Sequence, residues 1–149
     1  MSVAEQLSPQ ELAEACAKAM WTNDHASQFL NMKLIEVAPG KASIQMTVTR
    51  CMLNGHQSCH GGYIFTVADS ALAFACNGYN QWTVAQHCSV TFIAPAFEGD
   101  VLTASAKEVS RRGRGGIYDV AVVNQQGEQI AEFRGHSRTV KGTHLPEKR

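Results

Sequence analysis

Residues 63–76 read YIFTVADSALAFAC, an apolar run that is interrupted by one carboxylate, Asp69. A pair of glycines precedes the run and Asn77-Gly78 follows it, which predicts one helix from Gly61 to about Gly78. Such a helix is apolar nearly all round, so other elements have to cover most of its sides. The run is too short and too polar to span a bilayer.

Strand-like runs flank this helix on both sides. Before it, Ile44, Met46 and Val48 alternate with polar residues, which is typical of a half-buried strand. We expect strands at 33–38, 42–49, 82–93, 101–110, 116–124 and 129–140. Short connections between consecutive runs imply antiparallel pairing. The expected fold is α+β, with one curved antiparallel sheet wrapped around one long central helix, which is the hotdog fold.

The remaining segments are expected to complete a single domain over residues 1–149. Ser8-Pro9 with Glu11 is the pattern of a capped helix start, which predicts a helix from Pro9. Because a single wrapped sheet leaves strand edges exposed, we also expect two copies to pair through their strands. The expected parts are N-terminal helices at 1–31, a hotdog core at 33–140 and a frayed tail at 141–149.

Composition narrows the class of protein. A length of 149 residues suits one core, and a net charge of zero argues against a surface that attracts nucleic acid or anionic membranes as a whole. The first residues lack the apolar segment of a secretory signal. The five cysteines are odd in number and have no paired spacing, which favours a reduced, cytoplasmic protein.

Asp69 is the residue of the central helix that folding alone does not explain. Its neighbours at three and four positions are Phe65, Thr66, Leu72 and Ala73. Burying a carboxylate without a partner costs several kcal/mol in order of magnitude, and desolvation raises its pKa. Such carboxylates are candidates for general-base or nucleophilic catalysis. The alternative is that Asp69 lies on a solvated strip or accepts a hydrogen bond from a backbone group.

The loop before the helix reads NGHQSCHGG at 54–62 and offers complementary chemistry. A helix start presents free N–H groups, and glycines let a substrate approach the backbone closely. The N–H of Gly61 or Gly62 could therefore stabilise the oxyanion that develops from a thioester carbonyl. His60 could orient that carbonyl, and Asn54 could hold a water or the substrate. The alternative is that the glycines form a tight turn and the histidine has a structural hydrogen bond.

Two rival interpretations of this loop are weaker. Cys51, His56, Cys59 and His60 are all metal-ligand types, but their spacing lacks the paired cysteines of structural zinc sites. A Cys59–His nucleophilic pair lacks a third group to orient the histidine. We therefore expect no metal and no cofactor.

The block at 54–77 closely resembles the PaaI-like family of hotdog acyl-CoA thioesterases. The matching pattern is Asn54, then His60-Gly61-Gly62, then Asp69 in the helix. Further blocks also match, so the resemblance spans about 30–139. They read MTVT-x-x-MLNGH, FIAPAFEGD, IYDVAVVNQQG and FRGHS.

The resemblance implies hydrolysis of acyl-CoA thioesters, particularly phenylacetyl-CoA and hydroxylated or ring-modified relatives, with coenzyme A as part of the substrate. It also implies a homodimer or homotetramer with shared active sites, in which Asp69 faces the partner subunit's Gly61. His60 and Asn54 would support catalysis, and Gly62 and Tyr63 would contact the substrate. Related enzymes outside this family place a Ser or Thr hydroxyl where this chain has Ala85.

Two further features have competing interpretations. Arg111, Arg112 and Arg114 gather in one expected turn and could bind the phosphates of coenzyme A, or they could form a solvated hairpin. Aromatic residues of the helix could line an acyl pocket or belong to the core. These aromatic residues are Tyr63, Phe65 and Phe74.

Other functions remain possible from the sequence. One is a hotdog hydratase or dehydratase that pairs His60 with Asp69, and another is a non-catalytic acyl-CoA binding module. Saturated phenylacetyl-CoA separates the first from a thioesterase because it offers nothing to hydrate. Retention of Asp69 argues against the binding module.

Overall fold

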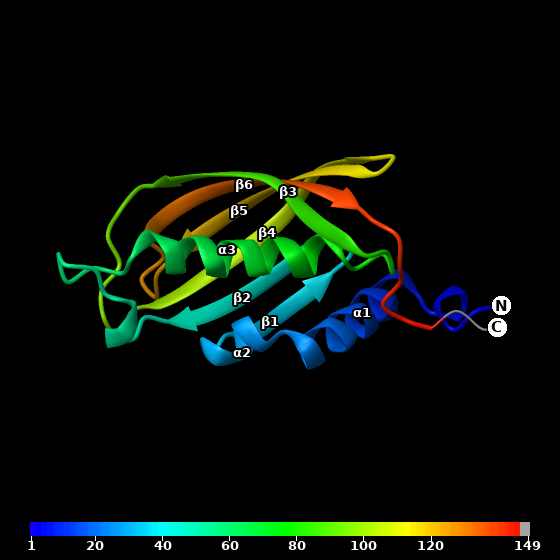
Figure 1. Ribbon diagram of the computed structural model, residues 1–149, viewed down its shortest axis with the longest axis horizontal. Helices are drawn as coiled ribbons and strands as arrows, with labels where there is room; N and C mark the ends of the chain where they lie inside the picture. The colour runs from blue at the N-terminus through cyan, green and yellow to red at the C-terminus, as the bar shows by residue number, and fades with distance from the viewer. Residues whose placement is uncertain (147–149) are drawn as a thin grey trace.

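The computed structural model of the chain describes residues 1–146. Figure 1 shows a curved sheet with one long helix lying in its concave side and two shorter helices beside one edge. The elements are α1 (Pro9–Asn23), α2 (His25–Phe29), β1 (Lys33–Ala38), β2 (Lys41–Thr47), α3 (Gly61–Cys76), β3 (Thr83–Phe92), β4 (Val101–Arg112), β5 (Gly115–Val123) and β6 (Gln129–Thr139), with 3₁₀ turns at Ala4–Gln6 and Arg50–Met52.

The six strands form one sheet in the order β1-β2-β4-β5-β6-β3, and every neighbouring pair is antiparallel. The sheet curls around α3 (Figure 1), so the predicted α+β architecture is confirmed. β1 and β3 are the edge strands of this sheet. The helix α1 packs beside β1 and leaves the β3 edge uncovered within the described residues.

The centre of the fold is α3, which is buried on most of its sides as its composition predicts. Close packing against β6 depends on a glycine: a Cβ atom at Gly135 would lie within van der Waals overlap of Leu72. The helix therefore sits directly on the sheet. The buried residues of α3 are Ile64, Val67, Ala68, Ala71, Leu72, Phe74, Ala75 and Cys76.

The predicted capping pattern of α1 is confirmed. The Ser8 hydroxyl accepts the Glu11 N–H at 3.2 Å, and the Ser8 N–H donates to the Glu11 carboxylate at 2.8 Å. Asp24 caps α2 by accepting the Ser27 N–H at 3.0 Å. These contacts satisfy the first backbone N–H groups of the two helices, and the Gln10 side chain, which donates to the Val37 carbonyl at 2.8 Å, joins α1 to β1.

The C-terminal segment differs from the expected frayed tail. Asn80 Oδ1 accepts the N–H groups of His144 at 3.1 Å and Leu145 at 2.9 Å, and the His144 ring bonds to Asn77 Oδ1 at 2.8 Å. The Trp82 N–H also donates to the Gly142 carbonyl at 3.0 Å. The prediction is therefore wrong up to residue 146, because polar side chains after α3 supply partners, while 147–149 lie outside the described residues.

Across residues 1–146, no helix is both long enough and apolar enough to cross a membrane.

Candidate active site

Asp69 lies half-buried on α3, in the middle of the helix. Its carboxylate has no hydrogen bond or ion pair with any residue in the described part of the chain. Burial raises its pKa above the ordinary value, and its negative charge helps raise the pKa of the Cys76 and Cys88 thiols. The predicted alternative of a backbone hydrogen bond is therefore not what the structure shows. Asp69 is a carboxylate without a competing partner among the described residues.

The start of α3 is arranged by His60. Its ring Nδ1 accepts the N–H of Gly62 at 2.9 Å, which makes His60 the N-cap of the helix. Because Nδ1 is the acceptor, the proton of the neutral ring is on Nε2. The Gly62 N–H is thus already used. The Gly61 N–H has no hydrogen-bond partner within residues 1–146, so it remains free to meet an oxyanion.

A cavity of about 430 Å³ opens at this helix start. Gly61 lies in its wall, so the free N–H borders a space that is large enough for part of a small ligand. The lining residues are Asn54, Ser58, Cys59, Gly61, Ile64, Phe92, Ile93, Ala94 and Pro95.

Asn54 holds the loop that forms one side of this cavity. Its Oδ1 accepts the N–H groups of His56 at 2.9 Å and Ser58 at 3.3 Å, and its Nδ2 donates to the Ser58 hydroxyl at 3.1 Å. The amide is therefore already engaged in positioning the loop. This contact is different from the predicted role of holding water or substrate.

Asp69 and Gly61 are well separated along one helix. Asp69 follows Gly61 by eight residues, which places their backbones about 12 Å apart at 1.5 Å per residue. A single chain therefore does not bring the carboxylate and the free N–H of the helix start together.

The aromatic residues of α3 divide between site and core. Tyr63 is half-buried and meets the His60 ring edge-on, with centroids 6.4 Å apart. Phe65 packs edge-to-face on Phe133 at 5.2 Å, and Phe74 is buried beside Trp21. The core interpretation is confirmed for Phe74, whereas Tyr63 lies next to the N-cap.

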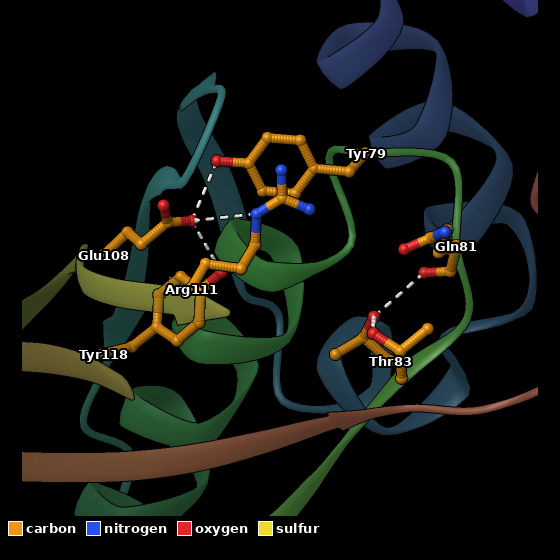
Figure 2. Close-up of polar contacts among 7 residues, drawn as sticks. Tyr79, Gln81, Thr83, Glu108, Arg111 and Tyr118 are labelled. Carbon is orange, nitrogen blue, oxygen red and sulfur yellow. Dashed lines mark hydrogen bonds and ion pairs between the residues drawn. The ribbon is translucent and has the colours of Figure 1, made fainter. Parts of the chain in front are cut away.

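Arg111 is held in place by its neighbours, as Figure 2 shows. Its guanidinium carbon lies 3.5 Å from the centroid of the Tyr79 ring, and its Nε lies 4.0 Å from Glu108 Oε2. The same carboxylate oxygen accepts the hydroxyls of Tyr79 and Tyr118, each at 2.8 Å. This Glu108 cluster ties the loop after α3 to β4 and β5.

The three arginines do not form the single turn that was predicted. Arg111 and Arg112 belong to β4, and successive strand residues point to opposite faces. Arg112 accordingly lines a separate hollow of about 290 Å³ that also includes His136. Arg114 lies in the turn, where its Nε donates to the Thr139 carbonyl at 3.2 Å. Arg112 and Arg114 keep their charged ends free of acidic partners in the described residues.

The rival chemistry at Cys59 is disfavoured. Burial and the negative charge of Asp100 raise the pKa of the Cys59 thiol to about 11, so the thiol stays protonated at neutral pH. Its S–H points at the His60 carbonyl, 3.7 Å away. Within residues 1–146, no three or more His, Cys, Asp or Glu side chains are placed to hold a metal ion.

Phe92 is a lining residue that the sequence did not predict for the site. It ends β3 and lies against Gly61, since an added Cβ at Gly61 would be 2.8 Å from the ring. The signal in the sequence was weak: Phe92 reads as one more apolar residue of a strand, and only the packed fold brings it to the helix start.

A central helix that presents an unpartnered carboxylate, inside a wrapped antiparallel sheet and with a free amide at its start, defines a hydrolase of the hotdog class. Comparison with known proteins agrees. Residues 56–131 match the thioesterase superfamily. The chain belongs to this family, which confirms the predicted enzyme class, a thioester hydrolase.

The chain is also similar to individual proteins of this family. The chain is 46% identical to the acyl-coenzyme A thioesterase PaaI of Escherichia coli K12 over 127 residues, which cover 85% of this chain and 91% of that protein. It superposes on the structure of the E. coli PaaI protein from the phenylacetic acid degradation operon with a TM-score of 0.90, at 44% identity over 91% of this chain and 99% of that one. A mutant of the phenylacetic acid degradation protein PaaI from Thermus thermophilus gives a TM-score of 0.76, at 32% identity over 78% and 100% of the two chains.

Proposed function

We propose that this thioesterase hydrolyses phenylacetyl-CoA or related aryl- and hydroxyaryl-acyl-CoA thioesters to the free acid and coenzyme A. The observation that carries the proposal is the half-buried carboxylate of Asp69, which has a raised pKa and no partner among the described residues. Similarity to proteins named for acyl-coenzyme A thioesterase activity and for phenylacetic acid degradation supports the substrate class.

The chemistry assigns one role to the middle of α3 and one to its start. In a water-mediated route Asp69 removes a proton from water, the oxygen of that water bonds to the thioester carbon, and the carbon–sulfur bond breaks to release the CoA thiol. In a covalent route Asp69 attacks the carbon itself, the carbon–sulfur bond breaks to release the CoA thiolate, which takes up a proton, and water then hydrolyses the resulting anhydride. In both routes the Gly61 N–H stabilises the oxyanion. The His60 Nε2–H helps to orient the thioester carbonyl. Neither route calls for a cofactor.

The separation of Asp69 from Gly61 supports a site shared by two copies of the chain. β3 is an edge strand of ten residues, and it carries an exposed apolar side chain at Val84. Antiparallel pairing of two β3 edges would set two α3 helices side by side in opposite directions, so that Asp69 faces the partner's Gly61. We therefore propose a homodimer as the catalytic unit and a homotetramer formed from two such dimers.

The first test is Asp69→Asn assayed by release of free CoA from phenylacetyl-CoA. We expect turnover to fall by about 10²- to 10⁴-fold, the range associated with loss of a general base. Asp119→Asn is the matched control, because Asp119 is a surface acid paired with Arg134. Near-normal turnover by Asp69→Asn would eliminate the proposed role. Because phenylacetyl-CoA has no double bond to hydrate, activity on it also excludes a hydratase.

The two chemical routes are separated by a single turnover in ¹⁸O-labelled water. In the covalent route, water that attacks the Asp69 carbon of the anhydride leaves one label on the Asp69 carboxylate and delivers unlabelled acid, whereas the water-mediated route labels only the acid. Label on Asp69 therefore demonstrates the covalent route. Mass analysis of the peptide that carries Asp69 gives the answer.

The shared site is tested by mixing two inactive variants. Gly61→Pro removes the donor N–H at the first position of α3, where the backbone accepts proline, and its added Cβ also displaces Phe92, so a site that contains this substitution is inactive. Mixed with Asp69→Asn and allowed to exchange subunits, it should restore about a quarter of wild-type activity, because half of the random dimers contain one intact site. No recovery in a mixture shown to contain heterodimers contradicts the shared site.

A further inference from the structure

The cavity at the start of α3 has an aromatic wall with no part in the chemistry proposed above. Phe92 is 52% exposed in the single chain, yet its ring lies directly against the helix start. A Cβ atom added to Gly61 would lie 2.8 Å from Cζ of that ring and 3.1 Å from Cε1. The ring therefore occupies the space beside the amide that receives the oxyanion.

The cavity lining separates into a polar and an apolar part. The side chains of Asn54 and Ser58 are hydrogen-bonded to each other and fix the loop. The remaining lining residues are mostly apolar, and Ile93 is 53% exposed next to Phe92. An apolar wall left open to the cavity is suited to an apolar group of a ligand. The apolar lining residues are Ile64, Phe92, Ile93, Ala94 and Pro95.

The position of the oxyanion decides whether the acyl group or the pantetheine arm of the substrate lies against this apolar wall. A carbonyl oxygen bound by the Gly61 N–H lies about 3 Å from the nitrogen, which brings the two groups on the carbonyl carbon within reach of Phe92. The pantetheine arm on the sulfur side contains amides, whose burial against a ring would leave them without hydrogen bonds. A phenylacetyl group has no such groups to satisfy and gains from leaving water.

We propose that Phe92, with Ile93 beside it, is the specificity-determining wall that receives the aromatic ring of the acyl group. This assignment rests on the proposed function, because it takes the thioester carbonyl to bind at Gly61. Contact between two aromatic rings in edge-to-face or offset geometry is more favourable than area alone explains, by a factor of about two to ten in binding. The wall therefore distinguishes an aryl group from a saturated ring of the same shape.

The test compares phenylacetyl-CoA with cyclohexylacetyl-CoA, which differ in aromaticity while sharing a six-membered ring. In the wild-type protein we expect kcat/KM to favour phenylacetyl-CoA by about two- to tenfold. Phe92→Leu keeps an apolar side chain and removes the ring, so the preference should fall to near one. Phe97→Leu is the matched control, because Phe97 is also 52% exposed and does not line the cavity. It should retain the wild-type preference.

Three outcomes would overturn the assignment. They are a wild-type protein without the aryl preference, a preference that Phe92→Leu leaves unchanged, and a Phe92→Leu variant whose molar mass shows loss of oligomers that the wild type and Phe97→Leu retain. The last result would make Phe92 an interface residue instead. If the wild type releases no CoA from either substrate, the proposed function itself fails, which is a different result from hydrolysis without discrimination.

Discussion

The main-chain N–H of Gly62 donates to Nδ1 of His60 at 2.9 Å, and this one bond decides how the start of α3 can be used. It satisfies the second amide of the helix, fixes the Nε2–H form of the histidine ring and leaves the N–H of Gly61 free. The His-Gly-Gly sequence thus supplies one capped amide and, directly before it in the chain, one available amide.

Asp69→Asn should not destabilise the protein. Burial raises the pKa of Asp69 in the folded state, so the folded state binds the proton more tightly and stability is lost as pH rises above the ordinary value of 3.8. At neutral pH the amide removes that penalty. We expect the Tm at pH 7 to rise above that of the wild type. A clear fall in Tm would show that the carboxylate has a stabilising partner.

Gly61→Ala should impair catalysis although it keeps the donor N–H. The added methyl group would lie 2.8 Å from the Phe92 ring, so either the ring or the helix start has to shift. A displacement of this kind is expected to lower kcat/KM by about ten- to a hundredfold. Gly61→Ala/Phe92→Leu should recover part of the loss. Gly55→Ala is the control, because nothing lies within 4 Å of its added Cβ.

Arg112 and Arg114 should contribute to nucleotide binding, whereas Arg111 should contribute to stability. Arg111 is held between Tyr79 and Glu108, and the other two have no acidic partner in the described part of the chain. Arg112→Gln/Arg114→Gln is expected to raise KM for acyl-CoA by about tenfold. The KM for S-phenylacetyl-N-acetylcysteamine, which has no phosphates, should stay the same. An equal effect on both substrates would disprove phosphate binding.

The stability of the protein should fall on mild acidification through His144. Partial burial against Asn77 lowers the pKa of His144 below the ordinary 6.5. As pH falls through 6.5 the unfolded chain takes up a proton before the folded one does, so the free energy of unfolding decreases until the folded-state pKa is passed. Urea unfolding at pH 7.5, 6.5 and 5.5 measures this slope.

His144→Gln should flatten that pH dependence, since glutamine can still bond to Asn77 and does not titrate. His56→Gln, at an exposed loop position, is the matched control and should leave the slope unchanged. Identical slopes in the wild type and His144→Gln would rule out His144 as the source.

Tyr118→Phe should cost about 1–2 kcal/mol of unfolding free energy. Tyr118 is 1% exposed, and its hydroxyl donates to Glu108 at 2.8 Å. Removing the hydroxyl leaves the half-buried carboxylate with one phenolic donor fewer. In a Glu108→Ala background the same change should cost less, which a double-mutant cycle measures. Equal costs in both backgrounds would show that the hydroxyl acts through another contact.

Local patterns predicted the secondary structure well. The bounds of β1 are those predicted from the sequence, and the strands follow one another along the chain as predicted. Ser8 with Glu11 forms the expected capping box. These features depend on residues that are close in sequence, such as the alternation of Ile44 and Met46. The apolar run around Asp69 was enough to identify both the central helix and its candidate base.

The faces of the sheet to which Arg111 and Arg112 point could not be predicted, because they depend on a β-bulge in β4. The register of β4 against β5 shifts between Glu108 and Ser110, which inserts Val109 and reverses the alternation of faces after it. Arg111 consequently shares the inner face with Glu108, while Arg112 points outward. Nothing in the local sequence marks this shift. The docking of the tail and the contact of Phe92 with Gly61 likewise depend on distant segments meeting.

The anchoring of His144 to Asn77 has a practical consequence for protein engineering. Asn77 ends the helix that carries Asp69. A reporter or affinity tag joined close after Leu145 would therefore disturb the hydrogen bond between His144 and the end of that helix. Met1 is 85% exposed and precedes the capped start of α1. Fusions to this enzyme should therefore be built on the amino-terminal side.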